Sequence, residues 1–497
     1  MSFLLLNQIR SQSLYYIVVF NIKTMSIPNA TTTLLKDLNS PKGSFISGNL
    51  NDFKKKNKHR ILEKWAKEYG ELYTIKLGPI KVLVSVNTEF NNTVLKHRPD
   101  KFRRLSKINE VFVEMGFHTV FNAEGENWKK QRKPVAEALN LKKVKGYYPI
   151  IKEKTSNLIS KIESYANTGN SVDIINDFIA FTIDVTTEIA FGYKLNTIHN
   201  KQDSFQNHLE LIFPMINDRI TSPIPIWRFF PKAKDRELKK SLKAIEVIIF
   251  QFIKKAKERI IENSDLRENP SNFLEALLIE SEKEDTVFDE KTLYGNVIAM
   301  LLAGEDTTSN TLSWTLYYLA QNPEIVKVIR KESVDNYSNH VPESYDEIAS
   351  LKYANAAIQE AIRLKPTTPI MFFQPNEDII INNLSVPKNT NIIIQNSFAS
   401  MQESNFSDPE KFDPNRWIKS ECPYHKNHNP KVIKAFGGGS RLCPGMNLSL
   451  VEMTTAISSI CKQFDISLSV DPLAVKENFA FTVSPENLKV QFKKASV

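Results

Sequence analysis

A glycine-rich segment near the C-terminus places the strongest constraint on this chain. Only 15 glycines occur among its 497 residues, and four of them lie between Phe436 and Gly445. Glycine permits positive φ angles and lets the backbone approach a flat ligand closely. A helical pattern follows from Met446 to Phe464, so Cys443 is expected just before a helix N-terminus.

This position favours the thiolate form of Cys443. The helix dipole and free N–H groups at a helix N-terminus stabilise negative charge. Arg441 adds a positive charge, which could also pair with an anionic group of a cofactor. A nucleophilic cysteine would use a nearby histidine base, and a zinc site would use more Cys or His ligands; the sequence offers neither close by. A phosphate-binding glycine loop would carry the Lys-Ser/Thr of a P-loop. A single thiolate suits the one axial ligand that a haem iron needs.

The composition agrees with a cofactor enzyme and argues against other classes. With 41% hydrophobic and 24% charged residues, the chain is typical of a globular protein large enough to enclose a cofactor. The net charge of +9 is spread along the chain, so we expect no nucleic-acid partner. This net positive charge is compatible with a basic patch that contacts an acidic protein partner or a membrane surface. Three cysteines, an odd and sparse set, indicate a reducing compartment.

Residues 1–40 are interpreted as an N-terminal extension without a transmembrane helix. Their most apolar run, Leu14 to Phe20, lies in an uncharged window of only 12 residues between Arg10 and Lys23. About 20 predominantly apolar residues are needed to span a bilayer. No small-residue cleavage site follows cleanly, so a signal peptide is not predicted. We expect a cytoplasmic protein and leave open a peripheral membrane contact or a mitochondrial presequence.

The remainder, residues 41–497, is predicted to be mainly α with small β-sheets. Helical periodicity dominates from about Leu50, and β-like runs occur at Leu72–Val86, at Ile379–Ile394 and in the last thirty residues. The longest helix candidate, Lys291–Ala320, would be roughly 45 Å long. Its middle, Ala303–Thr308, combines a glycine with two threonines, which are poor residues for a helix centre. We therefore expect a local distortion there.

The glycine-rich segment resembles the haem-binding signature of the cytochrome P-450 superfamily, Phe-x-x-Gly-x-Arg-x-Cys-x-Gly. Every fixed position matches: Phe436, Gly439, Arg441, Cys443 and Gly445. Members of this superfamily bind haem through a cysteine thiolate. The resemblance therefore implies haem b with Cys443 as axial ligand. It also implies the cytochrome P-450 fold, with the haem buried between a long central helix and the cysteine-loop helix.

The middle of the long helix resembles the oxygen-activation motif of the same superfamily. By that resemblance Ala303 contacts the haem, while Asp306 and Thr307 form an acid–alcohol pair above the iron. A hydroxyl can hold water by hydrogen bonds and a carboxylate can relay protons from solvent, which suits cleavage of a bound O–O bond.

Three further motifs agree in type and order. Glu360 and Arg363 match the Glu-x-x-Arg helix, and Arg416 lies in a segment that resembles the one supplying a second arginine. The resemblance implies that these three residues form a buried structural network. Trp128 and Arg132 match the Trp-x-x-x-Arg helix and are expected to face a haem propionate, since arginine is well suited to carboxylates.

The motifs leave two local questions. Gln374 stands where many relatives have a propionate-binding arginine, so Arg132 and Arg441 are expected to do more. Cys422, His425 and His428 do not match a standard zinc spacing, and a solvated polar loop is favoured there.

The resemblance covers roughly Lys42 to the C-terminus and implies a single haem-thiolate monooxygenase domain over residues 41–497. Such an enzyme activates O2 with two external electrons and hydroxylates or epoxidises a lipophilic molecule of the terpenoid, steroid or fatty acid class. Since the chain ends at Val497, soon after the haem domain, we expect a separate ferredoxin or flavodoxin-like donor with its reductase, and a monomer. The alternatives are a peroxide-driven or isomerase-type haem-thiolate enzyme and a non-catalytic haem sensor or carrier.

Two sets of residues follow from position along these motifs. Basic residues expected around the proximal face are candidates for docking an acidic donor; they are Lys129, Lys130, Lys133, Lys431 and Lys434. The expected substrate pocket is apolar and partly aromatic, as suits a lipophilic ligand; it comprises Val111, Phe112, Met115, Phe117, Met300, Ala303, Thr367, Thr368, Ile370, Met371, Phe479 and Phe481.

Overall fold

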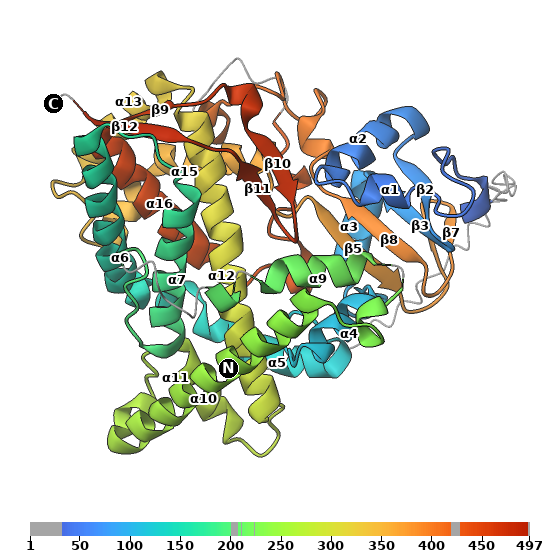
Figure 1. The fold of residues 1–497 in the computed structure, drawn as a ribbon, viewed down its shortest axis with the longest axis horizontal. Helices are drawn as coiled ribbons and strands as arrows, with labels where there is room; N and C mark the ends of the chain where they lie inside the picture. The colour runs from blue at the N-terminus through green and yellow to red at the C-terminus, as the bar shows by residue number, and fades with distance from the viewer. Residues whose placement is uncertain (1–31, 200–206, 210, 223, 419–427, 496–497) are drawn as a thin grey trace, which may run out of the picture.

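The computed structural model describes residues 32–199, 207–209, 211–222, 224–418 and 428–495 (Figure 1). The helices are α1 (Leu50–Phe53), α2 (Lys58–Tyr69), α3 (Thr88–Lys96), α4 (Ser106–Glu114), α5 (Gly125–Ala138), α6 (Leu141–Thr168), α7 (Ile175–Phe191), α9 (Ile212–Thr221), α10 (Ala233–Glu262), α11 (Phe273–Ser281), α12 (Glu290–Leu319), α13 (Pro323–Asn336), α14 (Tyr345–Ser350), α15 (Lys352–Leu364) and α16 (Met446–Gln463). The strands are β1 (Thr33–Leu34), β2 (Leu72–Leu77), β3 (Ile80–Ser85), β4 (Phe102–Arg104), β5 (Ile370–Pro375), β6 (Ile379–Ile381), β7 (Leu384–Val386), β8 (Asn391–Gln395), β9 (Phe464–Leu468), β10 (Lys476–Phe479), β11 (Val483–Glu486) and β12 (Val490–Lys494).

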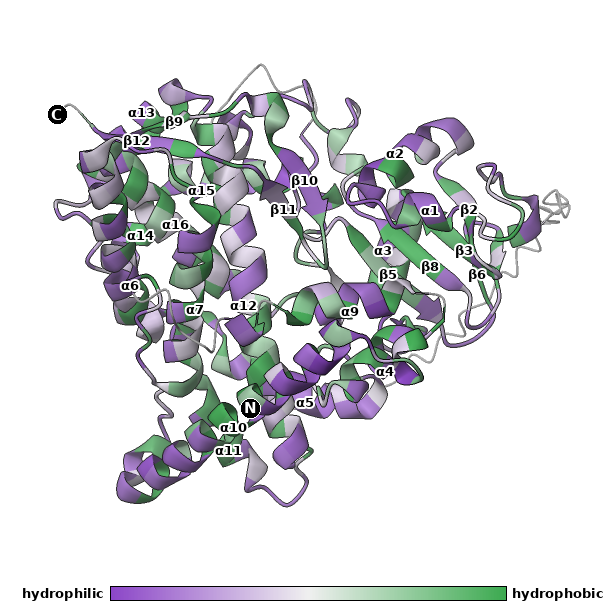
Figure 2. Ribbon diagram, viewed as in Figure 1, coloured by the Kyte–Doolittle hydropathy of each residue, from purple (hydrophilic) through white to green (hydrophobic). Residues whose placement is uncertain are grey.

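The architecture is mainly helical with small sheets, which confirms the predicted fold class. Most helices gather around α12, while the five-stranded sheet lies to one side of them (Figure 1). That sheet has the order β2-β3-β8-β5-β4, and its central strands are apolar (Figure 2). Smaller sheets pair β10 with β11 and β12 with β9, and join β1, β7 and β6. Most strands fall within the three β-like runs of the sequence, whereas β1, β4, β5 and β9 lie outside them.

The long helix is confirmed, but its predicted distortion is not found, because α12 continues without a break through its polar middle. Asp289 caps its start by accepting a hydrogen bond from the Thr292 N–H at 2.8 Å. The glycine in its middle has a packing role instead. A Cβ on Gly304 would lie 2.2 Å from Cγ2 of Thr186 on α7, so glycine allows the two helices to approach closely.

Part of the expected N-terminal extension takes part in the fold. Thr33 and Leu34 form β1, which pairs in parallel with β7. The last part of the expected extension is therefore attached to the sheet region. Within the described part of the chain, no helix is long and apolar enough to cross a membrane. The apolar run from Leu14 to Phe20 lies outside the described residues.

Candidate functional site

The cysteine loop enters α16 as the sequence predicts. Cys443 lies two residues before Gly445, which caps the start of α16. The loop is held by its own backbone, since the Cys443 N–H donates to the Phe436 carbonyl at 2.9 Å. Gly439 has a φ of 63°, and a Cβ there would lie 2.5 Å from the Leu95 carbonyl oxygen. This glycine therefore combines a left-handed turn with close contact to the end of α3.

The side chain of Cys443 is exposed, and the protein atoms packed around its sulfur affect the ionisation of the thiol. Burial raises the pKa of Cys443, while the Gly445 and Met446 N–H groups and the charge of Arg132 lower it, leaving the pKa above its ordinary value. The expectation that the loop alone favours the thiolate is therefore not met. A coordinating metal ion deprotonates a thiol by its own charge. The loop therefore fits a cofactor whose iron would stabilise the thiolate form of Cys443.

One face of α12 is accessible halfway along an otherwise buried helix. Ala303 is exposed and Ala299 and Thr307 are half-buried, while Leu301 and Leu302 between them are buried. A spacing of four residues places the accessible side chains on one helix face. The Thr307 hydroxyl donates to the Ala303 carbonyl at 2.8 Å. Small side chains on an accessible inner face leave room for a flat ligand against the helix.

The Asp306 carboxyl is held by two residues that the motif did not reveal. Thr482, at the tip between β10 and β11, donates its hydroxyl hydrogen bond to Oδ2 of Asp306. Asn310 donates to Oδ1 of Asp306 at 3.2 Å and to the Thr482 hydroxyl at 3.1 Å. Burial raises the pKa of Asp306 to about 6, although both hydrogen bonds lower it. Asn310 could have been found from its i,i+4 spacing, whereas nothing in the sequence connects Thr482 to the acid.

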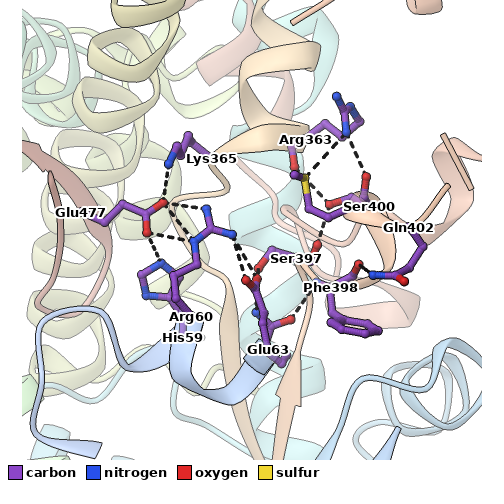
Figure 3. Close-up of polar contacts among 12 residues, drawn as sticks. His59, Arg60, Glu63, Arg363, Lys365, Ser397, Phe398, Ser400, Gln402 and Glu477 are labelled. Carbon is purple, nitrogen blue, oxygen red and sulfur yellow. Dashed lines mark hydrogen bonds and ion pairs between the residues drawn. The ribbon is translucent and has the colours of Figure 1, made fainter. Parts of the chain in front are cut away.

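A partly buried ionic cluster holds the base of the same β10–β11 hairpin (Figure 3). Glu477 on β10 accepts from Arg60 at 2.6 Å and from Lys365 at 2.7 Å, and its other oxygen lies 2.9 Å from His59 Nε2. Arg60 also pairs with Glu63 at 3.0 Å. The hairpin that carries Thr482 is therefore tied to both α2 and the end of α15.

Three arginines share one carboxylate beside the cysteine loop. Glu124 accepts a hydrogen bond from Arg441, lies 3.4 Å from Nη2 of Arg98, and accepts the backbone N–H of Arg104 at 2.8 Å. Burial, with the charge of Arg98, lowers the pKa of Arg441 to about 9. Nε of Arg98 and both Nε and Nη1 of Arg441 are buried without a hydrogen-bond partner among the described residues.

This arginine cluster fits the expected cofactor. The three guanidinium groups exceed the single Glu124 carboxylate by two positive charges. Buried donors without partners are costly, and the two propionates of a haem would supply both the missing charge and the missing acceptors. Arg98 and Arg104 were not predicted, because no short motif marks them.

The residues predicted from the Trp-x-x-x-Arg helix lie next to this cluster. Trp128 is buried on α5 with the Arg441 guanidinium 4.5 Å from its ring centre. Arg132, one turn later, donates to the Leu442 carbonyl beside Cys443. Gln374 is buried elsewhere in the sheet, where it accepts from the Ser106 N–H at 3.1 Å and donates to Asn391 at 2.8 Å.

The Glu-x-x-Arg residues form a buried network with the arginine of the later segment. Both oxygens of Glu360 accept from Arg363 at 2.8 Å, and Oε1 also accepts from Arg416 at 3.1 Å. Arg363 continues to the carbonyls of Ser400 and Pro409 at 2.9 and 2.7 Å. These bonds fasten α15 to the chain that leads into the cysteine loop.

The predicted pocket residues are distributed over several environments. Phe112 stacks on Phe121 at 5.1 Å, and Phe481 contacts Phe121 and Phe213 at 6.3 and 5.1 Å, forming an aromatic cluster between α4, α9 and the hairpin tip. Others are half-buried or exposed; they are Ala303, Thr367, Thr368 and Met371, the last lying in β5. The remainder are buried in the core; they are Val111, Met115, Phe117, Met300, Ile370 and Phe479.

The predicted docking lysines lie at the surface. Lys129, Lys130, Lys133 and Lys431 are exposed, and Lys434 is half-buried. Cys422 and His425 lie outside the described residues, whereas the His428 ring contacts the rings of Phe406 and Trp417. The described residues contain no group of three or more His, Cys, Asp or Glu side chains that could hold a metal ion.

Comparisons with known proteins agree with this geometry. The chain matches the model of the family "Cytochrome P450" over residues 38–492. It is 28% identical to cytochrome P450 71A27 of Arabidopsis thaliana over 458 residues, 89% of each chain. It is 26% identical to cytochrome P450 3A14 of Cavia porcellus, covering 80% of this chain and 79% of the relative. It is 25% identical to tabersonine 16-hydroxylase 1 of Catharanthus roseus, covering 89% and 88%.

The family match extends over nearly the whole described chain and includes each motif of the site. Proteins of this family are haem-thiolate monooxygenases that contain iron protoporphyrin IX, receive electrons from a redox partner and act on lipophilic substrates. The chain therefore belongs to the cytochrome P450 family.

Proposed function

We propose that this monooxygenase hydroxylates or epoxidises a lipophilic molecule of the terpenoid, steroid or fatty acid class. We further propose that a separate ferredoxin or flavodoxin-like donor with its reductase supplies its electrons, and that residues 41–497 act as one monomeric domain. The observation that carries this proposal is the pairing of an accessible inner face on α12, bearing Ala303 and Thr307, with an acid whose pKa is about 6.

Specific residues of the chain would hold the cofactor. Bound haem iron supplies the activation of dioxygen, with one oxygen atom entering the substrate and the other leaving as water. The Cys443 Sγ atom would bind the iron. Arg98, Arg132 and Arg441 would bind the propionates, since guanidinium groups suit carboxylates in planar geometry. Trp128 supports Arg441 by stacking beneath its guanidinium.

Proton delivery is assigned to Asp306 and Thr307. The Thr307 hydroxyl donates to Ala303, so its oxygen lone pairs remain able to accept a hydrogen bond from water at the accessible face. Asp306, with a pKa of about 6, can take a proton from solvent and release it again near neutral pH. Ala303 leaves space beside Thr307 because its side chain is a single methyl group.

Product analysis tests the reaction. Purified protein is screened with lipophilic compounds for a substrate-induced change in its absorption spectrum, and the compounds that bind are incubated with a surrogate ferredoxin, its reductase and 18O2. One labelled oxygen atom in the product is expected. Turnover with peroxide alone by Thr307→Ala, at the rate of the unaltered protein and with none from the reductase system, would favour the peroxide-driven or isomerase-type alternative.

The exposed lysines support an acidic electron donor. Opposite charges accelerate encounter mainly at low ionic strength. Charge reversal of Lys130 and Lys434 to glutamate is expected to slow reduction of the protein at low salt and to have less effect at high salt. Equal reduction rates in the variant and the unaltered protein at low salt would contradict this docking face.

We propose a cytoplasmic protein in peripheral contact with a membrane. The segment after α9 exposes Phe229 and Phe230 by 72% and 75%, and Phe45 and Ile46 are exposed by 95% and 83%. Exposed clusters of large apolar side chains mark interaction surfaces. Co-sedimentation with phosphatidylcholine vesicles should weaken when Phe229 and Phe230 are replaced by serine; unchanged co-sedimentation would contradict the contact.

A further inference from the structure

A pocket of about 240 Å³ lies between the five-stranded sheet, α1, α4 and α9. Its walls are mostly apolar; the apolar residues that line it are Leu50, Phe53, Leu77, Ile80, Val82, Leu105, Ile220, Phe372, Ile392 and Ile393. Its uncharged polar residues are Ser106, Thr221, Ser222, Gln374 and Asn391. This volume is smaller than the roughly 300–1,000 Å³ of whole-ligand pockets, so it suits one end of a ligand.

Lys107 is the one charged residue that lines this pocket. It is half-buried in the second position of α4, and its ammonium group has no hydrogen-bond or ion-pair partner among the described residues. Burial lowers the pKa of Lys107, although the charge of Glu110 raises it. A cation that loses water contacts without gaining a partner is unfavourable, and an anionic ligand group would reverse this.

The residues that could neutralise Lys107 are occupied elsewhere. Glu110 lies one turn further along α4, at a spacing that permits an ion pair with Lys107. Its carboxylate is instead 3.3 Å from Arg228, which also donates to Glu114 at 2.7 Å. Glu114 accepts in addition from Trp227 Nε1 at 3.0 Å. The segment after α9 therefore takes both acidic groups of α4 and leaves the pocket with a positive charge.

The start of α4 adds to this preference. The pocket is lined by Leu105, Ser106 and Lys107, the cap and first two residues of the helix. Positive partial charge at a helix N-terminus favours an anion. Leu105 provides no side-chain cap, and the Ser106 N–H donates to the neutral side-chain carbonyl of Gln374 at 3.1 Å, so the group at this helix start carries no negative charge.

We propose that this pocket binds the carboxylate end of a long-chain lipophilic acid, with Lys107 as its counter-ion and the apolar sheet surface in contact with its first methylene groups. The inference deepens the proposed function by selecting fatty acids among its three substrate classes, and it rests on that function only for turnover. Binding of the acid to the pocket is independent of any reaction.

The test compares hexadecanoic acid with hexadecan-1-ol, which has the same chain without the charge. Both are titrated into the full-length haem-containing protein by isothermal titration calorimetry. The unaltered protein should bind the acid more tightly than the alcohol. In Lys107→Met the affinity for the acid should fall about tenfold, as expected for loss of a charged hydrogen bond, while affinity for the alcohol stays the same.

Three further variants separate the charge from a general effect on structure. Lys107→Arg should retain the preference for the acid. Arg228→Gln should weaken acid binding with Lys107 intact, because Glu110, one turn from Lys107, becomes free to neutralise it. Lys101→Met, which removes an exposed lysine 3.8 Å from Glu377 and outside the pocket lining, should change nothing.

The outcomes are distinguishable from failure of the proposed reaction. Equal affinity of the unaltered protein for acid and alcohol would overturn the inference, as would a full preference for the acid in Lys107→Met. Preferential binding of the acid that depends on Lys107 supports the site even if hexadecanoic acid is not oxidised. Oxidation of only uncharged lipids, with no acid preference, would retain the proposed function and reject the pocket's ligand.

Discussion

Cys443 combines two opposing influences at a single residue. Burial raises the pKa of its thiol, while two N–H groups and Arg132 lower it. The chain therefore supplies the geometry of the ligand position, and a bound metal ion would supply the charge that keeps the sulfur deprotonated. A substitution that preserves shape but replaces sulfur should separate the two contributions.

Cys443→Ser is expected to lose the thiolate-type absorption spectrum of the reduced carbon monoxide complex, because a serine oxygen is a poorer electron donor than a thiolate. Difference spectroscopy measures this directly. Cys461→Ser is the matched control, since Cys461 is buried in the core on α16, away from the cysteine loop. A thiolate-type spectrum in Cys443→Ser would refute the ligand assignment.

Because of Asp306, the turnover rate is expected to change with pH around pH 6, as one limb of its pH profile. In the proposed proton delivery the protonated carboxyl is the donor; its fraction falls as pH rises through about 6, and the rate should fall with it. Asp306→Asn should lower the rate about a hundredfold and abolish this limb. The rate of product formation is followed as a function of pH.

Thr482→Val provides an independent check on the same limb. Its hydrogen bond lowers the pKa of Asp306, so removing the donor should shift the limb to higher pH. Ser484→Ala, nearby on β11, should leave the limb in place. A limb at the same pH in Thr482→Val would show that this hydrogen bond does not tune the acid.

Among the helices, α7 and α12 pack especially closely against each other. Gly304 has no room for a Cβ because Cγ2 of Thr186 would lie 2.2 Å away. Alanine gains about 1 kcal/mol in helix propensity over glycine. Overpacking in a dense core costs about 1–3 kcal/mol, so steric conflict should prevail.

Gly304→Ala is therefore expected to destabilise the protein, measured as a lower midpoint of thermal unfolding by circular dichroism. Thr186→Ser removes Cγ2 and keeps the hydroxyl that donates to the Thr182 carbonyl at 2.6 Å. The double variant Gly304→Ala with Thr186→Ser should recover most of the loss. Equal midpoints for Gly304→Ala and the unaltered protein would mean that the helices separate at little cost.

For the whole molecule, the Glu477 cluster joins the sheet side to the helical side (Figure 3). Burial alone would raise the pKa of Glu477, but hydrogen bonds from His59 and Arg60 and the charges of Arg60 and Lys365 hold it well below its usual range. A carboxyl with a lowered pKa stabilises the folded state above its ordinary pKa, and this stabilisation is lost as pH falls.

Glu477→Gln should lower the free energy of unfolding at neutral pH by about 2 kcal/mol, because Arg60 and Lys365 lose their shared, partly buried partner. The deficit should shrink below about pH 4.5, where the glutamate of an unfolded chain becomes protonated. Urea unfolding at several pH values measures both effects. Glu486→Gln, at the more exposed Lys56 pair, is the control. A deficit independent of pH would argue against the ionic role.

How much the sequence could predict depends on how far apart the partners lie along the chain. Local spacing sufficed for the cysteine loop, for Glu360 with Arg363 and for the length of α12. The bond from Arg441 to Glu124 and the bond from Thr482 to Asp306 join segments separated by 317 and 176 residues, so no motif encodes them. The expected distortion of α12 was wrong because glycine there permits contact with α7.

The arginine cluster also bears on how the protein is made. Three guanidinium groups around one carboxylate repel each other as the chain becomes compact. A ligand that binds only the folded state stabilises it by mass action, and two propionates would remove this repulsion. Biosynthesis and cofactor supply are then coupled: the yield of folded protein in a producing cell should rise with added 5-aminolevulinic acid, a haem precursor, and fall under haem starvation.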